Sequence, residues 1–74
     1  MKYYQANQFV VNKAAGDRAL RKFATEYPAA ADTISAIAGE PYIQVESIEI
    51  DDDYGIVTLD TGSGGSAEYA VELV

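Results

Sequence analysis

Apolar residues recur with two different periods along the chain, and the period changes near residue 40. Between Gly16 and Gly39 they are spaced by three and four positions, which is typical of one face of an α-helix. From Tyr42 onward they tend to alternate with polar residues, which is typical of a strand with one buried side. The pattern therefore predicts helices in the first half of the chain and strands in the second.

The first helix is predicted to begin after Gly16, with Asp17 as its N-cap. Its apolar stripe consists of Leu20, Phe23, Ala24 and Tyr27. Its opposite, polar side consists of Arg18, Arg21, Lys22 and Thr25. Pro28 is expected to end this helix and to begin the next one, since proline is well tolerated at the first position of a helix. The chain should therefore bend sharply at Tyr27 and Pro28.

The second helix is predicted to be short. Its narrow apolar stripe consists of Ala30, Ile34, Ile37 and Ala38. Gly39 stands where a glycine commonly ends a helix, and Pro41 follows just beyond it. Two short helices are therefore expected before the strands.

The stretch from Tyr42 to Ile50 is rich in β-branched residues and changes phase in its middle. Strict alternation turns Ile43 and Val45 to one side but Ile48 and Ile50 to the other. The slip falls at residues 46–47, so we expect a β-bulge or a bend between two short strands there.

Turn residues divide the rest of the chain into two further strands. Residues 51–55 form a predicted turn, residues 56–60 a strand, residues 60–66 a glycine-rich hairpin loop, and residues 67–74 the last strand. In that last strand the inward side consists of Tyr69, Val71 and Leu73, and the outward side of Glu68 and Glu72.

Residues 2–11 fit neither period well. A helix would align Tyr3, Ala6, Val10 and Ala14, whereas the aromatic and β-branched content favours a strand, which is our interpretation. The predicted fold is then α+β: one compact domain of residues 1–74, with an antiparallel β-sheet and a pair of short helices on one face, in the order β-α-α-β-β-β.

The composition removes several classes of function. The 74 residues include neither cysteine nor histidine. This excludes disulfides and thiolate sites, together with the usual general base and the usual zinc ligand. We therefore predict a protein that is not an enzyme and holds no cofactor or metal. No run of 18 apolar residues is present and no apolar segment follows residues 1–5, so a cytoplasmic location is expected.

Two short motifs suggest chemistry that the rest of the chain does not support. Residues 59–63 (Leu-Asp-Thr-Gly-Ser) resemble the active-site turn of aspartic proteases. That family also needs a second aspartate, which a homodimer could supply, and a bracing segment, which residues 61–74 are too few to hold. Residues 51–55 (Asp-Asp-Asp-Tyr-Gly) lack the glycine spacing of a calcium-binding loop. We interpret the two as a hairpin loop and a solvated turn, respectively.

Charge is distributed very unevenly along the chain. The total is −7, from 12 acidic and 5 basic residues. All five basic residues lie in the first 22 positions, where only Asp17 opposes them, so this segment carries 5 − 1 = +4 and residues 23–74 carry −11. An ordinary nucleic-acid binder, which needs a basic footprint, is therefore excluded. For the basic side of the first helix we favour pairing with nearby acids, or solvation, over contact with an anion.

The acidic residues of the second half fall on predicted strands and turns. Outward positions of a strand repeat every ~6.6–6.8 Å, and phosphates along one DNA strand are similarly separated, because each adds ~3.4 Å of rise plus a rotation. A tyrosine in the acidic turn adds contact area at small entropic cost. The predicted partner-binding residues are Glu46, Glu49, Asp51, Asp52, Asp53, Tyr54, Asp60, Glu68 and Glu72.

In size, charge, absence of cysteine and compact α+β build, the chain resembles the small acidic inhibitors encoded by phages, of which anti-CRISPR proteins and other DNA mimics are the leading examples. The resemblance implies a non-enzymatic inhibitor in the host cytoplasm. Its partner would be a basic nucleic-acid-binding surface of a host defence complex, such as a CRISPR effector, and it would bind neither nucleic acid nor membrane directly.

A second interpretation needs no mimicry. The chain contains six tyrosines, a residue type enriched in protein interfaces. It would then be a small tyrosine-rich interaction or regulatory domain, homodimeric through an edge strand such as residues 67–74.

Overall fold

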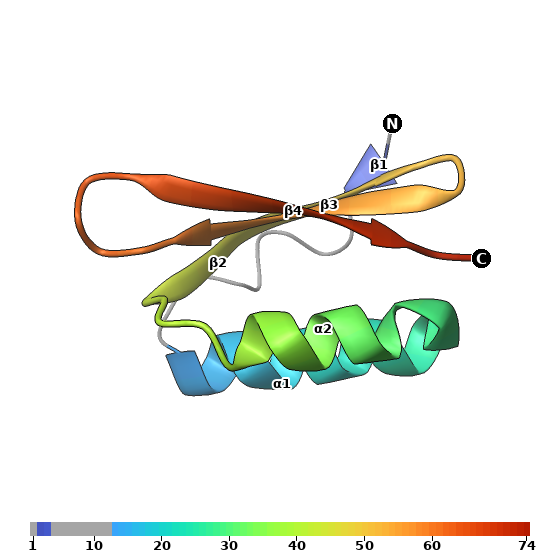
Figure 1. The fold of residues 1–74 in the computed structure, drawn as a ribbon, viewed down its shortest axis with the longest axis horizontal. Coiled ribbons are helices and arrows are strands. Elements are labelled where there is room, and N and C mark those ends of the chain that lie inside the picture. The colour runs from blue at the N-terminus through green and yellow to red at the C-terminus, as the bar shows by residue number, and fades with distance from the viewer. Residues whose placement is uncertain (1, 4–12) are drawn as a thin grey trace.

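A helical hairpin followed by an antiparallel sheet makes up the protein, as seen in a computed structural model that describes residues 2–3 and 13–74 (Figure 1). The elements are β1 (Lys2–Tyr3), α1 (Lys13–Glu26), the 3₁₀ turn η2 (Pro28–Ala30), α2 (Ala31–Ala38), β2 (Gln44–Asp51), β3 (Tyr54–Asp60) and β4 (Ser66–Glu72). The predicted α+β class and its α-α-β-β-β order are therefore confirmed. Of the strand predicted over residues 2–11, only the two residues of β1 are described, and the rest lies outside the described residues.

The sheet has the strand order β1-β2-β3-β4, and every neighbouring pair is antiparallel. The two helices run side by side along one face of it (Figure 1). No described element covers the opposite face, which is called the open face below. β4 forms one edge of the described sheet.

The core lies between the helix pair and the sheet. Its buried side chains are Leu20, Phe23, Ala30, Ile34, Ile37, Tyr42, Val45, Ile48, Val57, Leu59, Val71 and Leu73. Ala24, Tyr27, Ala38 and Tyr69 are partly buried against them. The apolar stripes predicted for both helices and for the last strand are thus confirmed, because each supplies side chains to this single core.

Helix α1 begins at Lys13, four residues before the predicted N-cap. Asp17 lies in the second turn of α1, so its assignment as N-cap is wrong. The glycine before it does not interrupt the helix but is buried in it. A Cβ atom at Gly16 would lie 3.1 Å from Tyr42 Cε2 and 3.1 Å from Val45 Cγ2, so glycine is the residue that lets α1 approach the sheet this closely.

The bend between the helices is where the sequence predicts it. Pro28 opens η2, which continues directly into α2. Gly39 follows the last residue of α2 as expected, but with a φ of −82°, so the helix ends without a left-handed residue.

A β-bulge interrupts β2 at the predicted place. The register between β2 and β3 shifts between Val45 and Ser47, which makes Glu46 the extra residue. The bulge brings Val45 and Ile48 to the same, buried face although they are three positions apart. Ile43, which strict alternation turns to the side of Val45, precedes β2 and is 52% exposed, so it does not join Val45 in the core; its neighbour Tyr42 is buried instead.

Two hairpins join the last three strands. Asp51 pairs with Tyr54, so the turn between β2 and β3 is Asp52-Asp53, and β3 begins two residues earlier than predicted. Asp52 has a φ of 53°, in the left-handed region. Asp60 pairs with Ser66 across the second loop, as predicted.

Candidate functional site

The residues of the open face follow from the strand registers, because side chains alternate between the two faces of a sheet. Positions that pair with one another across β2, β3 and β4 share a face. Those on the side away from the helices are Gln44, Ser47, Glu49, Asp51, Tyr54, Ile56, Thr58, Asp60, Ser66, Glu68, Ala70 and Glu72. None of them is buried.

Five carboxylates from three strands gather on this open face, and β2, β3 and β4 contain no basic residue. They are Glu49, Asp51, Asp60, Glu68 and Glu72. Asp52 and Asp53 are exposed at the turn that ends the face, and Glu46 is exposed at the bulge. With Tyr54, six of the nine predicted binding residues therefore share the open face, two lie at its end, and one lies at the bulge of β2.

Tyr54 lies between two of these carboxylates. The register places it beside Asp51 on one neighbouring strand and beside Glu72 on the other. Its hydroxyl donates a hydrogen bond of 3.3 Å to Asp51 Oδ2, and its side chain is 41% exposed. The negative charge of Asp51, and the hydrogen bond to it, raise the pKa of Tyr54 above its usual value. Tyr54 thus offers a neutral aromatic surface at the centre of an acidic row.

Asp60, at the other end of the face, shapes the loop that follows it. Its Oδ1 accepts a 2.9 Å hydrogen bond from the Gly62 amide, and Thr61 Oγ1 donates one of 3.2 Å to the Gly65 carbonyl. Gly62 and Gly64 have positive φ angles of 81° and 82°. The stretch that resembles a protease turn is thus a hairpin loop closed by its own hydrogen bonds.

Among residues 2–3 and 13–74, no three acidic side chains converge as they would around a metal ion. The three aspartates of the turn are spread instead over the end of β2 and the turn itself. Their arrangement is that of a charged surface.

The helical part and the strand part of the chain differ in net charge. Residues 13–42, which include both helices and the segment leading to β2, contain four basic and four acidic residues, so 4 − 4 = 0. Residues 43–74 contain eight acidic residues and no basic one, or −8. Residues 13–42, called the helical layer below, are therefore neutral overall, and the excess negative charge lies on residues 43–74, which include β2, β3, β4 and their turns.

One member of the basic segment is part of a cluster that the sequence analysis missed. Lys13 Nζ lies 3.5 Å from Asp17 Oδ1, donates a 2.8 Å hydrogen bond to the Ala38 carbonyl, and sits 4.2 Å from the ring centre of Tyr42. The Tyr42 hydroxyl donates to the same Asp17 oxygen. The spacing of Lys13 and Asp17 signals an ion pair on a helix, but nothing local signals Tyr42.

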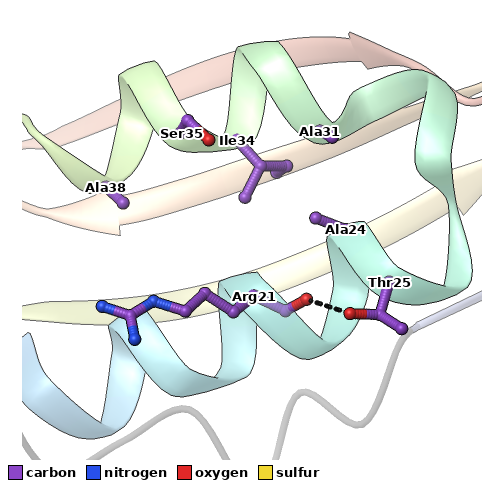
Figure 2. Close-up of a pocket in the computed structure, with 7 residues that line it drawn as sticks. All are labelled: Arg21, Ala24, Thr25, Ala31, Ile34, Ser35 and Ala38. Carbon is purple, nitrogen blue, oxygen red and sulfur yellow. Dashed lines mark hydrogen bonds between the residues drawn. The ribbon is translucent and has the colours of Figure 1, made fainter.

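A groove of about 460 Å³ lies between α1 and α2 (Figure 2). Most of the residues that line it within the described part of the chain have small side chains. The other two are the buried Ile34 and Arg21, the one ionisable residue among them. In Figure 2 the guanidinium of Arg21 points away from Thr25, whose hydroxyl is bonded to the Arg21 carbonyl. The described lining of the groove thus includes one charged side chain and no acid–base pair.

Comparison with protein-family models, curated protein sequences and solved structures finds no match to this chain. Within the described residues, no helix has both the length and the apolar character needed to cross a membrane.

Proposed function

We propose that the protein is a non-enzymatic inhibitor that binds other proteins through the open face of its sheet. It would occupy a basic nucleic-acid-binding surface of a host defence complex, in the manner of a phage anti-CRISPR protein or another DNA mimic, in the cytoplasm of the host cell. The observation that carries the proposal is the set of five open-face carboxylates on three strands that contain no basic residue.

The spacing of these carboxylates supports the proposal. Glu49 and Asp51 are neighbours on one face of β2, ~6.6–6.8 Å apart along the strand. Asp51 and Glu72 lie two strands apart, or roughly 10 Å, with Tyr54 between them. Successive phosphates of a DNA strand have a separation comparable to the first of these distances. Lysine and arginine side chains that grip a phosphate backbone can therefore engage several carboxylates at once.

The electrostatics also favour such a partner. A surface of one sign steers oppositely charged partners toward itself, and added salt weakens this attraction. Because the helical layer is neutral, the attraction would be directed to the sheet side. Binding should therefore be fast at low salt and lose strength as salt rises.

The experiment is a capture of partners by the full chain from bacterial lysate at low and at high salt, with competition by duplex DNA. We expect a nucleic-acid-binding complex to be captured at low salt, to be displaced by DNA, and to be bound less strongly by Asp51→Lys, Asp53→Lys and Glu72→Lys.

The helical layer supplies matched controls. Glu26→Lys and Asp32→Lys change the net charge by the same amount, and both acids are exposed on the helix pair. These variants should bind almost as well as the unchanged chain. If the helix variants and the sheet variants lost the same amount of binding, only the net charge of the chain would matter. If the sheet variants bound the partner as well as the unchanged chain does, the proposal would be wrong.

The alternative is an interaction domain without mimicry. The exposure of Tyr54 favours it, but the other tyrosine side chains of residues 13–74, Tyr27, Tyr42 and Tyr69, are buried or partly buried. Binding that is unaffected by salt and is lost in Tyr54→Ala would support this alternative over the inhibitor.

A further inference from the structure

The outer edge of β4 carries backbone groups for which the described sheet provides no partner. The Leu73 amide donates a 2.8 Å hydrogen bond to the Asp53 carbonyl, so the backbone of Leu73 points toward β3. Backbone direction alternates along an antiparallel strand. The residues at the alternate positions therefore direct their amides and carbonyls away from β3 and out of the sheet. They are Glu68, Ala70 and Glu72.

The side chains at these three positions decide what can pair with this edge. All three are exposed, with Glu68 and Glu72 on either side of Ala70 on the open face. A second copy pairing antiparallel about Ala70 would set Glu68 directly opposite Glu72 of that copy, and like charges in that position are destabilising. If the two copies paired about Tyr69 instead, Glu68 and Glu72 of both copies would still lie on the same face of the two paired strands. Self-association through β4 is thus opposed by charge.

The same two glutamates favour a strand of opposite charge. We propose that the outer edge of β4 binds an extended basic segment of the partner as an added antiparallel strand. This deepens the proposed function and rests on it, because it gives the basic partner a defined mode of binding. Addition of a strand to an open edge draws its affinity from backbone hydrogen bonds and its selectivity from alternate side chains.

The register specifies the segment. A basic residue would lie opposite Glu72, a small residue opposite Ala70, and a second basic residue opposite Glu68. The two intervening residues would face the helix side, next to Val71 and Tyr69, which pack in or against the core. The expected pattern is therefore basic, apolar, small, apolar, basic.

The test uses the full chain labelled with ¹⁵N and a blocked peptide, Gly-Lys-Val-Ala-Val-Lys-Gly. At saturating peptide, hydrogen exchange should slow at the amides of Glu68, Ala70 and Glu72. N-methylation of the peptide's alanine removes an amide that faces β4 and should weaken binding by about tenfold or more. N-methylation of its first valine alters an amide on the far edge and should leave the affinity within about twofold. All three peptides have the same charge.

A variant of the chain gives a second readout. Ala70→Pro removes one outward amide without changing charge or a bond to β3, and proline is tolerated on edge strands. This variant should no longer bind the peptide. If the variant does not fold, the comparison of the two N-methylated peptides on the unchanged chain still tests the proposal. Equal binding of the two methylated peptides, or failure of the parent peptide to bind, would overturn the strand addition. The open-face proposal fails separately, if Asp51→Lys, a change on the open face and away from β4, leaves capture of the partner intact.

Discussion

The hydroxyl of Tyr42 donates a hydrogen bond to the carboxylate of Asp17, a residue 25 positions earlier in the chain. Tyr42 is buried just before β2, and Asp17 lies in the second turn of α1. Since Lys13 contacts both residues and the end of α2, the pair ties both helices to the start of the sheet.

Tyr42→Phe should lower the free energy of unfolding by about 1–2 kcal/mol, because it removes a hydrogen bond to a charged acceptor. Urea unfolding at pH 7 measures the change. Tyr27→Phe is the matched control, since Tyr27 is partly buried and stacks near Phe23 with ring centres 4.9 Å apart. Equal effects of the two substitutions would contradict a special role for the Tyr42 hydroxyl.

The same tyrosine should make the fold sensitive to alkali. Burial, followed by the hydrogen bond to Asp17, raises the pKa of Tyr42 well above that of an unfolded tyrosine, which is about 10. Below pH 10 both states keep the proton and the stabilisation is complete. Above pH 10 the unfolded state loses it first, so the free energy of unfolding falls by up to ~1.4 kcal/mol per pH unit.

Urea unfolding between pH 8 and pH 11 tests this dependence. The difference in stability between the unchanged chain and Tyr42→Phe should shrink above pH 10, because other groups that titrate there affect both proteins alike. Parallel curves across the whole range would show that Tyr42 does not cause the alkaline loss.

Gly16→Ala should destabilise the protein although alanine favours helices. The new methyl group would lie 3.1 Å from atoms of Tyr42 and Val45, and neither can retreat, since one is held by Asp17 and the other is buried in the sheet. Overpacking costs about 1–3 kcal/mol, against a gain of ~1 kcal/mol in helix propensity. Thermal unfolding should show a net loss.

Gly39→Ala is the control for that substitution. Gly39 has an ordinary negative φ, and a Cβ there would meet its nearest neighbour at 3.4 Å. Its melting temperature should stay close to that of the unchanged chain. A rise in melting temperature for Gly16→Ala would mean that α1 can move away from the sheet.

Asp52→Gly should stabilise the protein by about 0.5–1 kcal/mol. Asp52 holds a φ of 53°, which a glycine adopts without the steric cost of a side chain. Asp53→Gly removes the same charge from the same turn at a residue without positive φ, and should be neutral or destabilising. Urea unfolding of the two variants separates the backbone effect from the charge effect; equal changes would assign the result to charge alone.

Features that depend on neighbouring residues could be predicted from the sequence. Simple alternation predicts that Val71 and Leu73 face the core while the glutamates beside them face outward. The change of phase at residues 46–47 predicted the bulge, because the register of a strand is set by its apolar side. The positions of the acidic residues likewise indicated that they fall on the strands and turns of the second half. In each case the relevant information lies within a few positions of the chain.

Features that depend on contacts between residues far apart in the chain could not be predicted from the sequence. Asp17 has the local signature of a helix cap, yet its partner Tyr42 lies 25 positions away. Gly16 resembles a helix breaker until the approach of Tyr42 and Val45 is known. The neutrality of the helical layer was also hidden, because acids such as Glu26 and Asp32 follow the basic segment in sequence but join it in space.

The open face has a consequence for how such a chain can change. Residues of the open face alternate along the strands with residues that hold the core, so one set of positions can be replaced while the other stays fixed. Under selection by a changing target, successive substitutions on the open face would alter what is bound without refolding the strands. The bulge at Glu46 and the close packing at Gly16 would then be retained in related chains even after the residues of the open face had all been replaced.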